Sequence, residues 1–514
     1  MHLITIILIL TLFPVLLPAQ SAKPKPLSND QYYDKVRGEW LGKLVGGALG
    51  MPIEGWNSED IVGSFGKVNS YVDGYFTERG AIGPSAESPP QRFLSDGAWH
   101  PVRARLTIPA YATGVVHPAP VLHMANRLQK TVLECEVRGL NFGSGVISNW
   151  HQVNQGWYFH KASQLGRKVT CPEAIALSLP AKESDMLRML PSQTKTLRLP
   201  PGRTLDLELE VRCTAGEPEA HFSLEYMSDR PGTGFLADDD TSWTMIGLLS
   251  LEKYGPDLSA KQISQSWMEF SGPGRADSML AELLVLHRLR SGIEPPESGN
   301  HPIGEAIGAQ MRGEIWGLVA PGRPAAAADY ARRDAMVSHR DNGIYGEQFI
   351  AAMMAAAFYE KSVPKLVQIG LAQIPASSKY ADVVRLAVEL HNQYPDFQDA
   401  LKILKSRYEA LSYVDVFVDA GIVSLALLYG DGDFEKSILV AAACGNDTDC
   451  NAANVGALIG CIQGAKALPA KWIEPIGDDF RCGVKGHEQW KISELARRIC
   501  AAGRNVQAFH GNDK

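Results

Sequence analysis

The chain has little of what marks a membrane, nucleic-acid-binding or disulfide-rich protein. Its formal net charge is -7 over 514 residues, so it lacks the basic excess that attracts nucleic acid or an anionic membrane surface. Beyond residue 18 no apolar run is long enough to span a bilayer. There are only 8 cysteines, with no CxxC motif and no His/Cys cluster typical of zinc sites. GxSxG, HExxH and P-loop motifs are also absent. These absences leave an ordinary globular protein with ample material for a large core.

The long apolar run that the sequence does contain lies at its N-terminus. LITIILILTLFPVLLP is followed by AQSAKPKP, in which Ala19-Gln20-Ser21 has the small residues typical of a signal-peptide cleavage site. This pattern predicts a cleaved signal peptide over residues 1–21 and an exported, periplasmic or extracellular protein. An uncleaved anchor is the alternative, although Pro14 and the short run disfavour a spanning helix. We therefore expect no stable membrane span after cleavage.

Export permits disulfides, and the cysteine positions suggest where they would form. Cys135, Cys171 and Cys213 fall in one β-like region, which predicts a bridge there. Cys482 and Cys500 form a second candidate pair.

The pattern of apolar and polar residues changes twice along the chain, which predicts three segments. Residues 22–87 and 231–514 are rich in apolar residues at helical spacing, with short Gly/Pro/Asn connectors. Residues 88–230 alternate apolar and polar residues between Pro, Gly and Asn, as in GRTLDLELEVR. The predicted fold is therefore mainly α, a compact helical bundle interrupted by a β-rich, sandwich-like insertion. Two independent helical domains or an α-solenoid are the alternatives.

Three adjacent carboxylates precede a predicted helix in ADDDTSWTM, residues 237–245. Asp238, Asp239 and Asp240 repel one another unless water or a cation screens them, and oxygen-rich clusters suit Mg²⁺ or Mn²⁺. The alternative is that one aspartate caps the helix and the others favour its positive end.

A second acidic motif, GNDTDC, repeats this arrangement near the other end of the chain. Asp447 and Asp449 precede a helix in which Gly456, Gly460 and Gly464 share one face. Small residues at that spacing permit close helix–helix approach, which would hold a metal site in a fixed position. The alternative is that the motif serves only to cap and pack the helix. Together the two motifs offer enough carboxylates to bridge two metal ions.

Glu54 follows a glycine-rich helix in GALGMPIEGW. A loop carboxylate beside a metal cluster is suited to general acid or base catalysis, whereas on its own it would be an ordinary solvated side chain.

Taken in order, GEWLGKLVGGALGMPIEGW (38–56), ADDDTSWTM (237–245) and ACGNDTDCNAANVGALIGCIQG (443–464) resemble the ADP-ribosylglycohydrolase family. The resemblance covers about residues 30–85 and 231–480, and it leaves the β-like stretch without a counterpart. It implies an all-α fold with two divalent metals, Mg²⁺ or Mn²⁺, below an ADP-ribose cleft.

The resemblance also assigns roles to residues. It implies metal ligation for one set: Asp238, Asp239, Asp240, Asp447, Asp449 and Cys450. It implies a catalytic part for Glu54, Asp239 and Asp447. Middle segments that resemble substrate-cleft regions add Gly308, Gln310, Arg312 and His339. The chain departs from the family pattern in having Asp238 and Cys450 where threonine is usual, and Gly47 where aspartate is frequent.

The implied activity is metal-dependent hydrolysis of a ribosyl glycosidic bond in an ADP-ribosyl-protein or a related ADP-ribose conjugate. Two alternatives stay open: an exported glycosidase or nucleosidase acting on another glycoside, and a non-catalytic relative that binds ligand. The β insertion is interpreted as a carbohydrate- or protein-binding module, or as a lid over the cleft.

Overall fold

The computed structural model describes residues 26–65, 67–71, 86–89, 91–107, 238–271, 280–408 and 414–511, together with the strands between residues 116 and 228 and the turn that joins the last two. The predicted signal peptide, residues 1–21, lies outside the described residues. Among the described helices, none combines the length and the apolar character that crossing a membrane requires.

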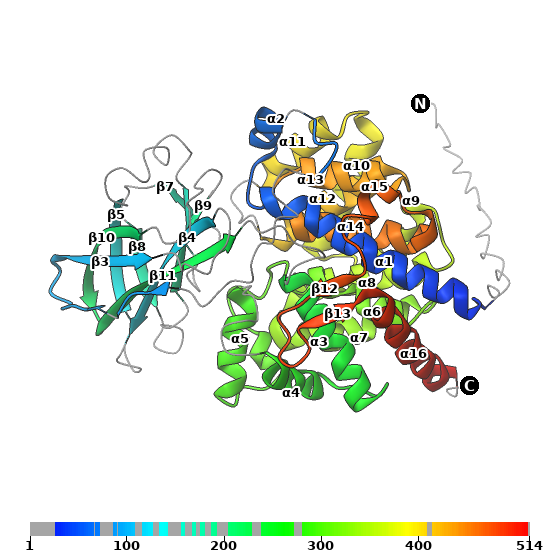
Figure 1. Cartoon of the computed structure of the whole chain (residues 1–514), viewed down its shortest axis with the longest axis horizontal. Coiled ribbons are helices and arrows are strands. Elements are labelled where there is room, and N and C mark those ends of the chain that lie inside the picture. The colour runs from blue at the N-terminus through cyan, green and yellow to red at the C-terminus, as the bar shows by residue number, and fades with distance from the viewer. Residues whose placement is uncertain are drawn as a thin grey trace, which may run out of the picture.

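The described chain is mainly helical, which confirms the predicted fold class. The first helices, α1 and α2, precede the strands, and the remaining helices follow them and complete one helical body (Figure 1). The helices have these bounds: α1 Asn29–Gly50, α2 Ser58–Phe65, α3 Asp239–Tyr254, α4 Ala260–Phe270, α5 Leu280–Arg290, α6 Glu314–Val319, α7 Pro324–Ser338, α8 Asp341–Ala357, α9 Val363–Leu371, α10 Lys379–Gln393, α11 Phe397–Tyr408, α12 Val416–Gly430, α13 Phe434–Ala443, α14 Thr448–Gln463, α15 Ala470–Ile473 and α16 Ile492–Gly511.

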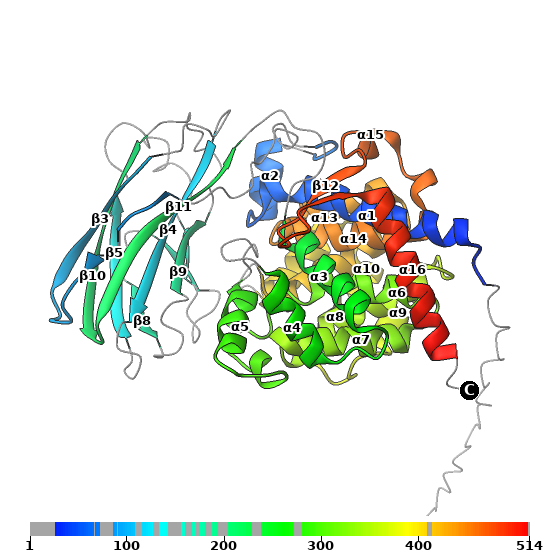
Figure 2. The ribbon, with the colours of Figure 1, turned by 60° about the horizontal axis from the view of Figure 1, so that its bottom comes forward.

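Strands make up most of the described part of the segment between α2 and α3, and both views show them gathered to one side of the helical body (Figures 1 and 2). They form two antiparallel sheets, one in the order β1-β11-β4-β9-β6-β7 with β2 on β11, and one in the order β3-β10-β5-β8. A separate hairpin, β12–β13, precedes α16. The strands have these bounds: β1 Ala86–Glu87, β2 Gln91–Arg92, β3 Trp99–Thr107, β4 Val116–Asn126, β5 Leu133–Asn141, β6 Gly156–Phe159, β7 Arg167–Thr170, β8 Ile175–Leu179, β9 Leu187–Ser192, β10 Thr204–Ala215, β11 Pro218–Ser228, β12 Asp479–Arg481 and β13 Gln489–Lys491.

Helices α1 and α14 form the centre of the helical body and pack backbone against backbone. A Cβ on Gly42 would lie only 2.0 Å from the carbonyl oxygen of Gly456, and a Cβ on Gly38 would lie 2.4 Å from that of Gly460. Small residues are therefore required on both helices, as the glycine spacing of α14 predicted. Gly464 ends α14 with a φ of 82° and still packs against α1, since a Cβ there would lie 2.4 Å from Oδ2 of Asp34.

The cysteines confirm one predicted bridge and contradict the other. Cys213 on β10 is disulfide-bonded, and its cross-strand neighbour in register on β5 is Cys135. Cys482 and Cys500 both keep their thiols, so the second predicted pair is wrong. The thiol of Cys482 instead donates a hydrogen bond to the carbonyl oxygen of His487 at 3.0 Å.

Candidate metal centre

Carboxylates from three distant segments converge at one end of the α1–α14 pair. Three groups of donors have ligand atoms within 4.8 Å of one another. They are Glu54 with Asp447 and Asp449, Asp240 with Asp449 and Cys450, and Asp238 with Asp239 and Asp240. Because Asp449 and Asp240 each belong to two groups, the three groups form one continuous cluster. The structure thus brings together every predicted metal ligand and Glu54.

The first acidic motif, Asp238–Asp240, both caps a helix and contributes carboxylates to the cluster. Asp238 is the N-cap of α3, and its Oδ1 accepts a hydrogen bond from the backbone N–H of Thr241 at 3.3 Å. Asp239 and Asp240 occupy the first turn of that helix, where its positive end favours carboxylates. Capping therefore engages one oxygen of Asp238, and Asp238 still belongs with Asp239 and Asp240 to one donor group.

The second motif does not cap its helix with a side chain. Asp447 stands at the N-cap of α14 but makes no capping hydrogen bond. Gly445 and Asn446 before it take left-handed φ values of 74° and 68°, which turn the chain sharply into the helix. Oδ1 of Asp447 is buried without a hydrogen-bond partner among the described residues. The capping explanation therefore fails for this aspartate.

Glu54 reaches the cluster because its loop pairs with the loop before α14. The backbone N–H of Gly55 donates to the carbonyl oxygen of Asn446 at 2.8 Å. The backbone N–H of Asn446 donates in turn to the carbonyl oxygen of Trp56, also at 2.8 Å. Thr448 fastens the end of α1 as well, since its Oγ1 donates to the carbonyl oxygen of Gly50 at 2.8 Å. Glu54 itself is exposed, so it lies on the solvent side of a mostly buried set of carboxylates.

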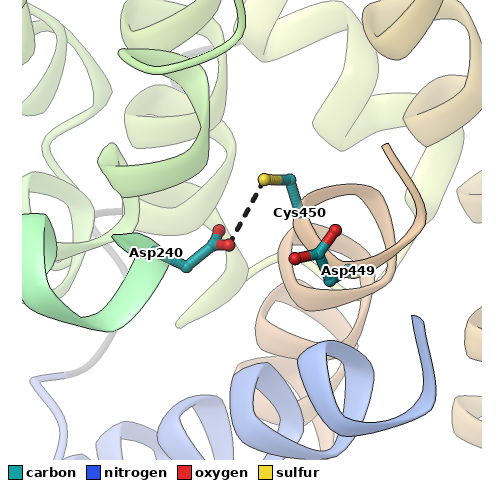
Figure 3. Close-up of side chains that lie close together, drawn as sticks. All are labelled: Asp240, Asp449 and Cys450. Atoms are coloured by element: carbon teal, nitrogen blue, oxygen red, sulfur yellow. Dashed lines mark hydrogen bonds between the residues drawn. The ribbon is translucent and has the colours of Figure 1, made fainter. Parts of the chain in front are cut away.

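Cys450 faces Asp240 across the gap between α14 and α3 (Figure 3). Its thiol donates to Oδ2 of Asp240 at 3.3 Å and lies 3.9 Å from Sδ of Met311. The side chain is only 3% exposed. Cys450 thus occupies the donor position at which the sequence comparison expected a threonine.

The cluster holds more negative charge than its protein neighbours compensate. Burial raises the pKa of Asp447 well above its ordinary value, and nearby carboxylates, led by Asp449, raise it further. Burial likewise raises the pKa of Asp239 and of Asp240, with neighbouring aspartates adding to the effect. Such carboxylates ionise readily only when a cation is supplied.

Lys43 is a site residue that the sequence prediction missed. Its ammonium is fully buried, lies 3.6 Å from Oδ1 of Asp240, and contacts Glu314 at 3.2 Å. Burial, the largest single influence, lowers the pKa of Lys43, but the nearby carboxylates, led by Glu314 and Asp240, together outweigh burial and hold that pKa above its ordinary value. The available signal was Glu39 and Lys43 four residues apart within the otherwise apolar, glycine-rich stretch 38–50.

Gln310, predicted to bind substrate, is connected to the centre through buried hydrogen bonds. Its Nε2 donates to Oδ1 of Asn454 at 3.4 Å, and its Oε1 accepts from Tyr380 at 2.8 Å. Asn454 in turn donates to Glu314, the partner of Lys43. Gln310 is fully buried, so it supports the centre from inside the fold.

Arg312, Gly308 and His339 assemble around a different buried cluster. The guanidinium of Arg312 donates to Glu282 at 2.9 Å, to Asp334 at 3.3 Å and to the carbonyl oxygen of Gly308 at 2.6 Å. A Cβ on Gly308 would collide with the Glu282 carboxylate at 2.4 Å. Arg312 is fully buried and its N–H groups are occupied. The structure therefore gives it a role in the core, which the substrate-contact prediction did not anticipate.

His339 lies beside that cluster and is 1% exposed. Its Nδ1 is 2.6 Å from Oγ of Ser338, which also accepts from Arg312. Burial, followed by the positive charge of Arg312, holds the pKa of His339 well below its ordinary value. A neutral, enclosed imidazole supports the fold around Arg312.

The donor chemistry fits divalent cations. Within the described part of the chain, Oδ1 of Asp447 is buried without a hydrogen bond, and Oδ1 of Asp240 faces only the ammonium of Lys43 at 3.6 Å. Carboxylate oxygens in such a cluster are the ligands that hard divalent cations prefer. The fold and the cluster together define a helical protein with a candidate divalent-metal centre.

The comparisons with known proteins place the chain in a family. The model of the ADP-ribosylglycohydrolase family matches residues 28–191 and 192–508, so the chain belongs to that family. This match runs through the strands and is wider than the resemblance seen in the motifs. A protein of Archaeoglobus fulgidus described as uncharacterized is 24% identical over 251 residues, covering 47% of this chain and 75% of the relative. A solved structure titled ADP-ribosylglycohydrolase-related protein complex is 18% identical, covers 54% of this chain and 84% of that one, and has a TM-score of 0.40.

Proposed function

We propose that the chain is a hydrolase that uses two divalent cations, Mg²⁺ or Mn²⁺, to cleave a ribosyl glycosidic bond in ADP-ribosylated protein or a related ADP-ribose conjugate. The observation that carries this proposal is the convergence of Glu54, the Asp238–Asp240 run and the Asp447/Asp449 pair in a member of the ADP-ribosylglycohydrolase family. Family membership supports glycosidic-bond hydrolysis, and the cluster supports a metal-dependent form of it.

The buried and the exposed residues of the cluster would have different roles in the reaction. Asp240, Asp447 and Asp449 are buried and would hold the cations, with Asp238, Asp239 and Cys450 completing the set. When bound, the cations would supply positive charge that holds ribose hydroxyls and favours ionisation of a water molecule.

Glu54 is exposed at the edge of the cluster and is therefore placed to move protons. It would accept a proton from the attacking water as the bond between the anomeric carbon and the leaving atom breaks. The water oxygen then bonds to the anomeric carbon, and the proton passes to the leaving group. Asp239, which is half-buried, and Asp447 would orient the reacting groups.

Release of ADP-ribose from modified arginine and serine peptides tests this function. The metal-free full chain should act only after Mg²⁺ or Mn²⁺ is added, and Asp447→Asn should lose at least about a hundredfold in rate, on the scale of a general catalytic group. Asp431→Asn is the matched control, because Asp431 is an exposed residue at the C-cap of α12. A rate that survives both chelator and Asp447→Asn would overturn the metal mechanism. Turnover of other ribosides or glycans alone would favour the glycosidase alternative, and binding without turnover would favour the non-catalytic one.

We also propose that the protein is exported. The apolar N-terminal run and the disulfide at Cys213 support this location, since structural disulfides persist in oxidising compartments. N-terminal sequencing of the mature protein should begin at Ala22. A mature chain that keeps residues 1–21 in the cytosolic fraction would contradict export.

A further inference from the structure

The donors of the candidate centre are chemically unequal on its two sides. The group of Glu54, Asp447 and Asp449 offers only oxygen, whereas the group of Asp240, Asp449 and Cys450 includes a sulfur. Asp449 is common to both groups, so the two positions are neighbours.

We propose that this centre is built for two different cations: a hard one, Mg²⁺ or Mn²⁺, at Glu54, Asp447 and Asp449, and a borderline, sulfur-tolerant one of the Zn²⁺ or Co²⁺ class at Asp240, Asp449 and Cys450. The inference rests on the metal-centre part of the proposed function. It revises that proposal at one position, where the chain's own Cys450 favours a borderline metal in place of a second Mg²⁺ or Mn²⁺.

The geometry around Cys450 supports a ligand and not simply a packed thiol. Sγ points at the carboxylate of Asp240, 3.3 Å away, and Figure 3 shows Asp449 beside them. Among the described residues Oδ1 of Asp240 has no hydrogen-bond partner and faces only the ammonium of Lys43, 3.6 Å away, so this carboxylate still has capacity for a cation. Met311 Sδ, 3.9 Å from the thiol, makes the surroundings of this position softer still.

Ligand chemistry decides which cation each position prefers. Thiolates favour Zn²⁺ and related borderline metals over Mg²⁺, while carboxylate-only sites favour Mg²⁺, Ca²⁺ and Mn²⁺. On binding, the S–H bond of Cys450 breaks, its proton passes to solvent, and the sulfur electron pair forms the bond to the cation. No oxidation or reduction is involved. A magnesium ion would gain little from this sulfur, so a borderline metal should displace it there.

Cobalt(II) provides a direct spectroscopic test on the metal-free full chain. Titration with Co²⁺ should produce a near-ultraviolet thiolate-to-cobalt charge-transfer band that excess Mg²⁺ does not remove. Cys450→Thr should abolish the band and lower the preference for Zn²⁺ over Mg²⁺ by at least about tenfold, the lower end of the effects seen for groups that only support metal ligands. Cys461→Thr is the matched control, because Cys461 is a second buried cysteine of α14 and should leave the band intact.

Two outcomes of the titration would overturn the inference: no charge-transfer band in the parent chain, or an equal band in Cys450→Thr. A measurement on the parent chain alone covers the case in which the variant does not fold. X-ray absorption of the chain loaded with Zn²⁺ should show a sulfur neighbour at about 2.3 Å, whereas only nitrogen or oxygen neighbours at about 2.0–2.2 Å would refute a thiolate ligand.

The inference and the proposed function fail in different ways. A cobalt–thiolate band in a chain that releases no ADP-ribose with any metal would leave the inference standing and reject the hydrolase. ADP-ribose release without any sulfur coordination would do the reverse.

Discussion

Gly42 on α1 and Gly456 on α14 lie so close that each excludes a side chain from the other. A Cβ on Gly42 would lie 2.0 Å from the carbonyl oxygen of Gly456, and a Cβ on Gly456 would lie 2.2 Å from that of Gly42. This contact fixes the distance between the helix whose exit loop carries Glu54 and the helix whose first turn carries Asp449.

Gly42→Ala should therefore destabilise the fold although alanine favours helices. The added methyl group meets backbone, which cannot move aside as a side chain would, so we expect a loss of about 3 kcal/mol in the free energy of unfolding, the upper range for overpacking. Urea denaturation measures it. Gly511→Ala is the control, because Gly511 ends α16 with nothing near its Cβ, and it should change stability by less than about 1 kcal/mol. Equal effects of the two substitutions would contradict the packing argument.

Lys43→Met removes the buried ammonium and leaves Glu314 and Asp240 without it. Breaking a buried ion pair from one side costs about 3–5 kcal/mol, so the metal-free variant should be strongly destabilised. Saturating Mn²⁺ should restore part of the stability, because a bound cation offsets the charge of Asp240. The exposed pair of Lys253 with Glu269 gives the control, and Lys253→Met should have little effect. Thermal unfolding with and without metal distinguishes these cases, and an unaffected Lys43→Met would refute the role given to this ion pair.

The elements of the fold were predictable to different extents. The helical spacing, the alternation of β10 and the positions of both acidic motifs are local patterns. Such patterns can be recognised from the sequence alone. The partner of the α14 glycine face was not local: it is α1, some 400 positions earlier, as the hydrogen bond from Thr448 to Gly50 shows with its separation of 398 residues. The pairing of two glycine helices could be inferred only from the three-dimensional contact.

Buried charges were the hardest site residues to predict. The sequence does not show that Lys43 and Arg312 are buried, because charged side chains are rarely fully buried unless they are paired. Their partners, such as Glu314 and Glu282, come from other segments. The acidic motifs were found because their aspartates are consecutive or nearly so, and Lys43 was missed because its pairing is tertiary.

Arg312→Lys tests whether Arg312 supports the core or contacts a ligand. Lysine keeps the charge but loses the planar fork that reaches Glu282, Asp334 and Ser338 together. Buried acceptors left unsatisfied should cost roughly 1–3 kcal/mol each in the free energy of unfolding. Metal affinity, measured by calorimetry, should stay within a factor of about two, because Arg312 contacts a different set of acids from those of the metal centre. A large fall in affinity without loss of stability would contradict a role in the core.

Asp415 predicts a pH dependence of stability that is separate from the metal cluster. It caps α12 through a hydrogen bond from the N–H of Phe417 at 2.9 Å, and burial raises its pKa to about 7. A carboxyl whose pKa is higher in the folded than in the unfolded chain stabilises below the unfolded pKa, near 4, and loses that stabilisation as the pH rises through about 7. Asp415→Asn keeps the cap without the charge, so its stability relative to the parent should improve from pH 4 to pH 8.

The control for this titration is Asp433→Asn, the same change at the exposed N-cap of α13. Unfolding curves at pH 4, 6 and 8 compare both variants with the parent. A pH slope of equal size in the two would show that loss of any capping carboxylate explains the effect, and that burial of Asp415 does not.

The pairing of α1 with α14 also sets the order in which the molecule is completed during synthesis. Helix α1 is made before the strands, yet its glycine face, with Gly38 and Gly46, packs on a helix made almost 400 residues later. All the strands between α2 and α3 are translated in the interval. Helix α1 therefore reaches its packed position only after α14 has been made, and until then its glycine face and its charges, Glu39 and Lys43, stay open to misplaced contacts.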